Sequence, residues 1–284
     1  MKDLRKGNIF NNTRVEYYSR NSLIKKSISN YAAKSKAGSN FNNEPKQNQD
    51  SYNIIQNYCN IEDQWFSCVC DGHGIYGHLV SDFIKTNLSI YVGNIYQNFI
   101  QEIPGNKEEN KVKFKFVKGD NCEDGILSLS SLKANALLKK AFYQIDFDLE
   151  AKTKINIDLS GSTCVSVILN KKKLICANVG DSRAILASRI IDNENRIHWE
   201  ITELSHDHKP TLKEEAQRIL SAKGILEPLY GLNKIDEEGH PLGPLRVWAK
   251  GKDYPGLSMS RSFGDRIGRK CGVVCEPGML IRNN

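Results

Sequence analysis

Long apolar segments are absent from this 284-residue sequence. No window approaches the roughly 18 consecutive apolar residues that a membrane-spanning helix needs. The N-terminus holds neither the apolar core of a secretory signal nor a glycine at position 2 for myristoylation. We therefore expect an intracellular protein, cytoplasmic or nuclear, with no transmembrane segment.

Paired cysteine motifs are also lacking, although the chain has eight cysteines. Several lie inside apolar, strand-like runs: Cys68, Cys70, Cys164 and Cys176. Free thiols in such runs behave as small buried hydrophobic groups in a reducing compartment. Cys271 and Cys275 have no second pair at zinc-ligand spacing, so no zinc site is expected.

Acidic residues are scarce at the N-terminal end. Residues 1–37 hold nine Lys or Arg against Asp3 and Glu16, with few large apolar side chains. This composition predicts a mobile basic tail, ahead of a domain over residues 38–284. Contact with an anionic membrane or an acidic partner is the alternative to a simply solvated tail. Because the rest of the chain is nearly neutral, the net charge of +7 does not indicate a nucleic-acid partner.

Hydrophobic periodicity predicts an α+β protein. Strand-like runs occupy residues 51–58, 65–70, 162–169, 174–179, 184–187 and 198–204. Two long segments have helical spacing, with apolar faces formed by Val80, Phe83, Ile84 and Leu88 and by Leu138, Phe142, Ile145 and Leu149. The short segment 170–173 between two strand-like runs predicts a hairpin turn. Two antiparallel helices in a strand-rich chain predict a layered fold.

A third helix and two loops complete the expected organisation. Thr211 and Glu214 have the spacing of a capping box, and Gly224 is expected to end the helix that follows. Residues 101–130 lack a clear period and predict an insertion loop, and residues 225–256 predict a long surface loop.

The motif Asp71-Gly72-His73-Gly74 follows a buried strand-like run and combines a carboxylate, a flexible turn and an imidazole. An aspartate there can bridge divalent cations, Gly72 lets a backbone carbonyl reach them, and His73 can protonate a leaving group. A turn with Asp71 as the N-cap of a helix explains the isolated motif equally well.

Further aspartates occur in similar contexts, namely Asp50, Asp181 and Asp265. Mg²⁺ and Mn²⁺ prefer oxygen ligands from a few carboxylates, so aspartates at several element ends suit such a site. Ser182 beside Asp181 could indicate an esterase nucleophile, but no matching Asp and His partners follow. Arg183 is interpreted as a structural residue that packs or pairs, and residues 207–210 as the turn before the third helix.

The order of these motifs is specific. They are Lys46-Gln47-Asn48-Gln49-Asp50-Ser51, Asp71-Gly72-His73-Gly74, Gly161-Ser162-Thr163, Ala177-Asn178-Val179-Gly180-Asp181-Ser182-Arg183-Ala184, Asp207-His208-Lys209-Pro210, Arg246-Val247-Trp248 and Pro255-Gly256-Leu257-Ser258-Met259-Ser260-Arg261-Ser262-Phe263-Gly264-Asp265. Over about 240 residues the series resembles the PPM/PP2C family of metal-dependent Ser/Thr protein phosphatases, in a plant- or protist-like branch.

The resemblance implies two antiparallel β-sheets in a sandwich flanked by pairs of antiparallel helices. It also implies two Mg²⁺ or Mn²⁺ ions and a weaker third. Asp71 would bridge the two ions, Gly72 would bind one through its carbonyl, and Asp265 would hold the other. Asp50 would hold water on the ions, and Asp181, with Asp265, would form the third position.

The same resemblance implies that His73 is the general acid for the departing Ser or Thr oxygen. Metal-bound water would attack phosphorus without a covalent intermediate. Phosphorylated proteins would be the substrates, residues 225–256 would be the flap that shapes substrate choice, and the protein is expected to be a monomer.

The sequence departs from the family pattern in two places. Pro45 stands where many members have a phosphate-binding Arg, so Lys46 is expected to bind phosphate, and Gln49 replaces a Glu. The sequence stops at Asn284, before an Asp-Gly metal ligand, closing strands and a helix that the resemblance implies. We expect a fold lacking those elements. The alternative function is a pseudophosphatase that binds phosphoproteins or a partner.

Overall fold

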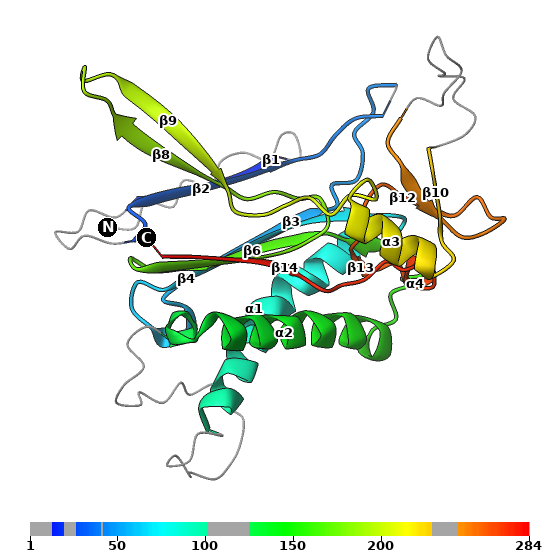
Figure 1. Cartoon of the computed structure of the whole chain (residues 1–284), viewed down its shortest axis with the longest axis horizontal. Coiled ribbons are helices and arrows are strands. Elements are labelled where there is room, and N and C mark those ends of the chain that lie inside the picture. The colour runs from blue at the N-terminus through cyan, green and yellow to red at the C-terminus, as the bar shows by residue number, and fades with distance from the viewer. Residues whose placement is uncertain (1–12, 20–26, 41, 102–124, 229–242, 284) are drawn as a thin grey trace.

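A central antiparallel sheet carries most of the core (Figure 1). The computed structural model describes residues 13–19, 27–40, 42–101, 125–228 and 243–283. The sheet has the order β13-β5-β4-β6-β7-β14, and β3 also pairs with β4. Its strands are β3 (Asp50–Gln56), β4 (Trp65–His73), β5 (Gly161–Ser162), β6 (Cys164–Leu169), β7 (Lys173–Val179), β13 (Phe263–Gly264) and β14 (Gly278–Asn283).

Two long helices cover one face of this sheet (Figure 1). Helix α1 (Gly77–Gln101) leads away from the end of β4, and α2 (Ser131–Lys152) returns toward it. The predicted apolar faces are confirmed, because Ile84, Leu88, Phe142 and Leu149 are fully buried against the sheet. Their spacing of three or four residues keeps them on one side of each helix.

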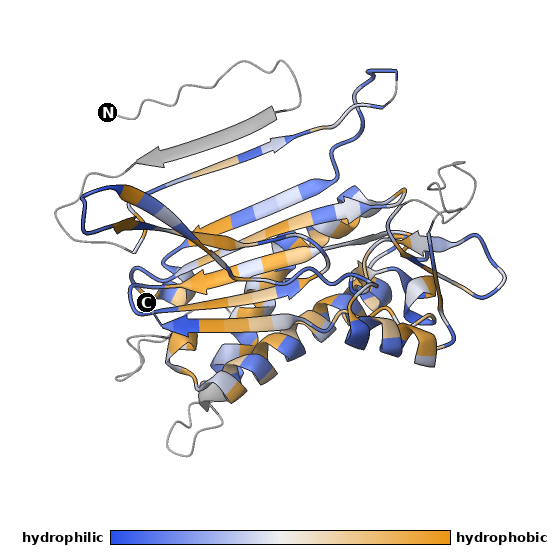
Figure 2. Ribbon diagram, turned by 45° about the horizontal axis from the view of Figure 1, so that its top comes forward, coloured by the Kyte–Doolittle hydropathy of each residue, from blue (hydrophilic) through white to orange (hydrophobic). Residues whose placement is uncertain are grey.

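The two-residue alternation of the strands supplies the other half of this core. On β4, Phe66, Cys68 and Cys70 point into the helix side and are buried, whereas Val69 is half exposed on the opposite face. The hairpin predicted at residues 170–173 is confirmed, since β6 and β7 pair on either side of it. Figure 2 shows the hydrophobic stretches of the strands between the helices and the outer ladders.

Two further ladders lie on the side of the sheet away from the helices (Figures 1 and 2). One pairs β1 (Thr13–Ser19) with β2 (Asn30–Lys36), and the other pairs β8 (Ile185–Ile191) with β9 (Ile197–Glu203). A smaller core beneath β8 includes Val165, Cys176 and Leu204. In the described residues these ladders stay separate two-stranded units, so the α+β class is confirmed while a continuous second sheet is not formed.

Residues 13–19 and 30–36 of the expected basic tail, 1–37, form the strands β1 and β2, whereas residues 1–12 and 20–26 lie outside the described residues. Strand β2 alternates exposed and half-buried positions, with Tyr31, Ala33 and Ser35 turned inward. The ring of Tyr31 meets that of Trp65 at 5.4 Å, and Ser35 Oγ accepts a hydrogen bond from Asn48. This alternation was not recognised from the sequence, because the inward residues of β2 include small ones that give a weak hydrophobic signal and lysines dominate the segment.

A third region packs around α3 (Lys213–Ser221). Its sheet contains β10 (Ile225–Glu227), β11 (Arg246–Trp248) and β12 (Pro255–Leu257), and α4 (Arg266–Arg269) lies against it. Ile219, Val247 and Val273 form the core of this region. The ends of the expected flap, residues 225–256, are therefore strands, and its middle, 229–242, lies outside the described residues.

Two smaller predictions also change. The capping box of Thr211 and Glu214 does not form, because α3 starts at Lys213 with Leu212 as its N-cap. The insertion loop expected over 101–130 ends earlier, since a 3-10 turn, η2 (Gly125–Ser128), precedes α2. The rest of that loop, 102–124, lies outside the described residues. Within the described parts of the chain, we find no helix with the length and apolarity needed to cross a membrane.

Candidate active site

Two aspartates face each other directly where β3 begins and β4 approaches its end. Asp50 is the ladder partner of Asp71 in the β3–β4 register. Asp71 is fixed from the other side by Thr163, whose Oγ1 accepts a hydrogen bond from the Asp71 N–H at 3.0 Å. The Thr163 N–H in turn donates to the Asp71 carbonyl at 2.9 Å. Like charges directly opposite in a ladder destabilise it, so this pair favours a cation.

Uncompensated negative charge at this position changes the titration of Asp71. Partial burial and the charges of Asp50 and Asp181 raise the pKa of the Asp71 carboxyl, against an opposing effect of His73. In the described part of the chain, no lysine or arginine forms an ion pair with Asp50 or Asp71.

The turn after Asp71 requires glycine. A Cβ on Gly72 would lie 2.3 Å from the Gly77 carbonyl oxygen and 2.7 Å from that of Gln49. Gly74 has a φ of +78°, and a Cβ there would meet the Leu159 oxygen at 2.1 Å. These contacts bring the start of α1 and the segment after α2 against the end of β4, so side chains larger than hydrogen are excluded.

His73 is paired with Asp265. The His73 Nε2 atom lies 2.6 Å from Asp265 Oδ2, and the Asp265 side chain is almost fully buried. Burial alone would lower the pKa of His73. The charge and hydrogen bond of Asp265, helped by Asp71 and Asp181, outweigh it, so the pKa of His73 is raised. The pair therefore favours a protonated imidazole beside the aspartates.

Several contacts hold Asp265 in this position. Its backbone is left-handed, with φ 44°, and its N–H donates to the Ser160 carbonyl at 3.0 Å. Ser262 Oγ donates to the same Oδ2 atom at 2.6 Å. A Cβ on Gly161 would meet that oxygen at 2.3 Å, so Gly161 leaves room for the carboxylate. The Oδ1 atom is buried and has no hydrogen-bond partner.

Helix α2 supports the same segment. Asp146, buried on α2, accepts a hydrogen bond at 2.9 Å from the N–H of Gly264, next to Asp265. Arg269 pairs with Asp146 at 2.5 Å. Asp146 could not be recognised from the sequence, because an amphipathic helix has many polar positions. Only its burial in the structure distinguishes it from the exposed ones.

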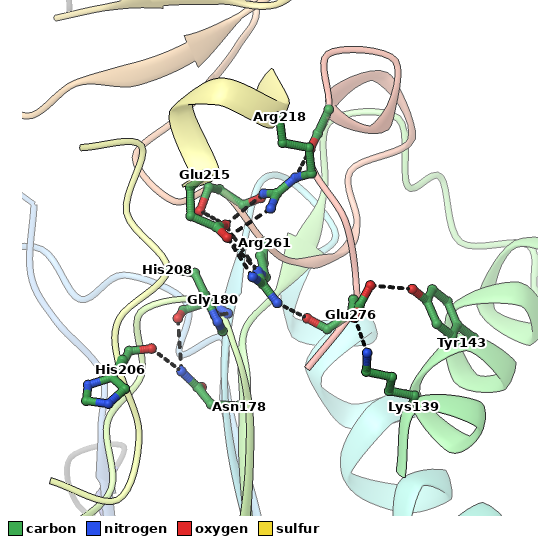
Figure 3. A network of polar contacts seen from close by, with 12 residues as sticks. Lys139, Tyr143, Asn178, Gly180, His206, His208, Glu215, Arg218, Arg261 and Glu276 are labelled. Atoms are coloured by element: carbon green, nitrogen blue, oxygen red, sulfur yellow. Dashed lines mark hydrogen bonds and ion pairs between the residues drawn. The ribbon is translucent and has the colours of Figure 1, made fainter. Parts of the chain in front are cut away.

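Asp181 lies on a separate turn and pairs with Lys209. The Gly180 N–H donates to His208 Nδ1 at 3.2 Å, and the His208 N–H donates to the Gly180 carbonyl at 3.0 Å. Asn178 Nδ2 bridges the carbonyls of Gly180 and His206, as Figure 3 shows. Residues 207–210 were interpreted only as a turn, so the contact of Lys209 with Asp181 is a finding of the structure.

A buried ion network anchors the segment that precedes Asp265 (Figure 3). Glu215 of α3 accepts two hydrogen bonds from Arg218, at 2.9 and 2.7 Å, and pairs with Arg261 at 2.6 Å. Arg261 Nη1 also donates to the Glu276 carbonyl at 2.8 Å. Although burial opposes ionisation of Glu215, the two arginines and the hydroxyl of Ser260 outweigh it and lower its pKa.

The remaining predicted residues stand apart from this cluster. Lys46 is exposed on the loop before β3, with its backbone N–H bonded to the Gly38 carbonyl at 2.8 Å. Arg183 binds both carboxylate oxygens of Asp207, at 3.0 and 2.9 Å, which agrees with the structural role expected from the sequence. The structure thus brings Asp50 and Asp181 within electrostatic reach of Asp71, and it pairs Asp265 with His73.

The donor chemistry fits a hard divalent cation. Carboxylates at element ends, an opposed aspartate pair and a buried Asp265 oxygen without a partner are suitable oxygen ligands. Within the described ranges, no three His, Cys, Asp or Glu side chains converge as a ready-made metal site.

The fold and the site define an α+β protein with an acidic centre at one end of its sheet. The family described as "Protein phosphatase 2C" matches residues 35–283. The chain is 31% identical over 243 residues to "Probable protein phosphatase 2C 38" of Oryza sativa subsp. japonica, covering 81% of this chain and 50% of the relative. It is 32% identical over 235 residues to "Probable protein phosphatase 2C 65" of Arabidopsis thaliana, covering 83% and 55%.

The solved structures agree in fold. A serine-threonine phosphatase 2C from Toxoplasma gondii superposes with a TM-score of 0.59 at 17% identity, over 84% of this chain and 70% of that one. The chain belongs to the protein phosphatase 2C family. It spans about half the length of the curated relatives it matches.

Proposed function

We propose that this chain carries the metal-dependent phosphatase activity of its family and hydrolyses phosphoserine and phosphothreonine in proteins. The single observation that carries the proposal is the opposed Asp50–Asp71 pair, followed two residues later by the His73–Asp265 hydrogen bond. An acidic pair beside a protonated imidazole supplies both a cation site and a proton donor.

The proposed ligands are Asp71, the Gly72 carbonyl, Asp50, Asp181 and the unpartnered Oδ1 of Asp265. Mg²⁺ or Mn²⁺ held there would supply an activated water and neutralise phosphoryl oxygens. Thr163 fixes Asp71 through two hydrogen bonds, so the carboxylate is oriented before a cation arrives. Lys46, on the exposed loop before β3, is proposed to attract the substrate phosphate as a flexible point charge.

His73 is proposed to protonate the departing oxygen of the Ser or Thr side chain. Asp265 orients the ring through Nε2, which leaves Nδ1 as the atom that delivers the proton. The bonds of Asp265 Oδ2 to His73 and Ser262 support a positioning role for this residue. Its buried Oδ1 has no hydrogen-bond partner, which supports the metal-ligand role that the sequence resemblance implies.

Phosphate release from a phosphoserine peptide tests the proposal. The full chain is expected to release phosphate with Mn²⁺ and to stop when the metal is chelated, while Asp71→Asn stays inactive. Asp82→Asn, which changes an exposed carboxylate on α1, is the charge-matched control. Peptide binding without turnover would contradict the proposal and favour the alternative of a phosphoprotein-binding module.

The compartment and assembly belong to the same proposal. Seven described cysteines are buried and free, among them Cys70 and Cys164 on neighbouring strands, which fits a reducing intracellular compartment, cytoplasmic or nuclear. We propose a monomer acting on phosphorylated proteins. Sedimentation of the purified full chain checks the oligomeric state.

A further inference from the structure

We propose that the ammonium group of Lys209 binds the carboxylate of Asp181 and competes with a divalent ion for it. The inference rests on the proposed function, because it takes Asp181 as a cation ligand. It goes further in assigning a role to a lysine for which neither the sequence motifs nor the site argument required one.

The first support is that the pair is built by the backbone on both sides. Gly180 and His208, the residues directly before Asp181 and Lys209, exchange two hydrogen bonds, at 3.0 and 3.2 Å. Asn178 adds a third tie by donating to the carbonyls of Gly180 and His206 (Figure 3). These hydrogen bonds fix the two turns against each other. The side chains of Asp181 and Lys209 are therefore held close together by the backbone.

The second support is the imbalance of charge around the pair. Asp50 and Asp71 have no lysine or arginine partner among the described residues, whereas Asp181, whose charge reaches Asp71, has one. The ammonium group of Lys209 therefore neutralises Asp181, while Asp50 and Asp71 keep their negative charges without such a partner. A cation entering the acidic group must displace that ammonium before it can use Asp181.

The third support is that displacement is feasible. The Lys209 side chain is 37% exposed and that of Asp181 is 20% exposed, so neither charge is locked in the core. Asp207 is a second acceptor for Lys209, because the charge of Lys209, like that of its partner Arg183, lowers the pKa of the Asp207 carboxyl. Lys209 can therefore leave Asp181 without losing all of its electrostatic stabilisation.

Manganese binding by calorimetry tests the inference on the full chain. Relative to the wild type, Lys209→Met is expected to bind its weakest Mn²⁺ about tenfold more tightly, since a competing unit charge is removed at contact distance. Lys213→Met is the matched control, because it removes one exposed positive charge from the start of α3 nearby. Its affinity is expected to equal that of the wild type.

The outcomes separate the inference from the proposed function. If the wild type binds Mn²⁺ and Lys209→Met binds it no more tightly, the inference is overturned and the phosphatase proposal stands. If no variant binds Mn²⁺, both are overturned. If only Lys209→Met shows binding at a further site, the inference is supported.

A second measurement uses the wild-type chain, so its result does not depend on whether the variant folds. Acetylation of lysines by an N-hydroxysuccinimide ester, read by mass spectrometry, reports how free each ammonium is. Adding Mn²⁺ is expected to raise the labelling of Lys209 severalfold and to leave Lys213 unchanged. Equal labelling of Lys209 with and without Mn²⁺ would overturn the inference.

Discussion

Nε2 of His73 lies 2.6 Å from Oδ2 of Asp265, although 192 positions separate the two residues in the chain. One comes from the end of β4 and the other from the turn between β13 and α4. The charge and hydrogen bond of Asp265, with the charges of Asp71 and Asp181, raise the pKa of this half-buried imidazole against the effect of burial.

Asp265→Asn is expected to lower the pKa of His73, because the charge that outweighs burial is lost. Asn tolerates the left-handed backbone at this position, so the fold should persist. The imidazole signal in an NMR pH titration of the metal-free chain measures the shift. An unchanged pKa would show that Asp265 does not control the ring.

The same substitution separates proton donation from other roles. Turnover of a phosphoserine peptide is expected to fall roughly 10²-fold or more, the lower range for a lost general acid. Hydrolysis of p-nitrophenyl phosphate should fall much less, because its leaving group needs no proton. Ser262→Ala, which removes only a donor to Asp265, is the milder control. Equal losses on both substrates would argue for a metal-ligand role of Asp265.

Asp71→Asn is expected to change stability in opposite directions with and without metal. Without metal, the free energy of unfolding should rise by up to about 1 kcal/mol, because repulsion with Asp50 is relieved. With Mn²⁺ at about 100 times its dissociation constant, the wild type should gain roughly 3 kcal/mol that the variant lacks. Urea unfolding with and without Mn²⁺ measures both, and an equal gain in the variant would contradict the assignment.

His208 should make the fold sensitive to mild acid. Burial, followed by the charge of Arg261, lowers its pKa to about 4, against an ordinary value near 6.5. At pH values between about 4 and 6.5, His208 binds a proton in the unfolded chain but not in the folded chain. The free energy of unfolding therefore falls as the pH drops from about 6.5 toward 4. The loss amounts to roughly 3 kcal/mol.

Urea unfolding between pH 4.5 and 7.5 checks this slope. His208→Asn keeps an acceptor for the Gly180 N–H but cannot titrate, so its stability should depend less on pH over this range. A variant with the same slope as the wild type would show that other groups cause the acid sensitivity.

Glu215→Gln is expected to destabilise the fold by about 3–5 kcal/mol, because Arg218 and Arg261 then share a part-buried site without a counter-charge. Arg183→Gln, at an exposed ion pair with Asp207, should have little effect on stability. Thermal unfolding of both variants measures the contrast. Similar small shifts in both would mean that the Glu215 network is not a structural anchor.

Local patterns in the sequence were sufficient for much of this protein. Helical spacing placed α1 and α2 and their buried faces, and strand-like runs placed β3, β4, β6 and β7, because both signals come from residues a few positions apart. The ordered motifs were sufficient for the family and for placing Asp50 and Asp71 at the ends of facing strands. The alternation in β2 was overlooked because charge dominates its composition.

Only the tertiary structure decided how the polar groups are paired. Asp265, expected to hold a metal, is bonded to His73 and Ser262, and Asp181 is bonded to Lys209. Asp146 supports Asp265 from a helix that the sequence marks only as amphipathic. The pairs His73–Asp265 and Gly264–Asp146 are separated by 192 and 118 positions, so no local pattern predicts them. A carboxylate in a turn has the same local sequence whether it binds a cation, a lysine or a histidine.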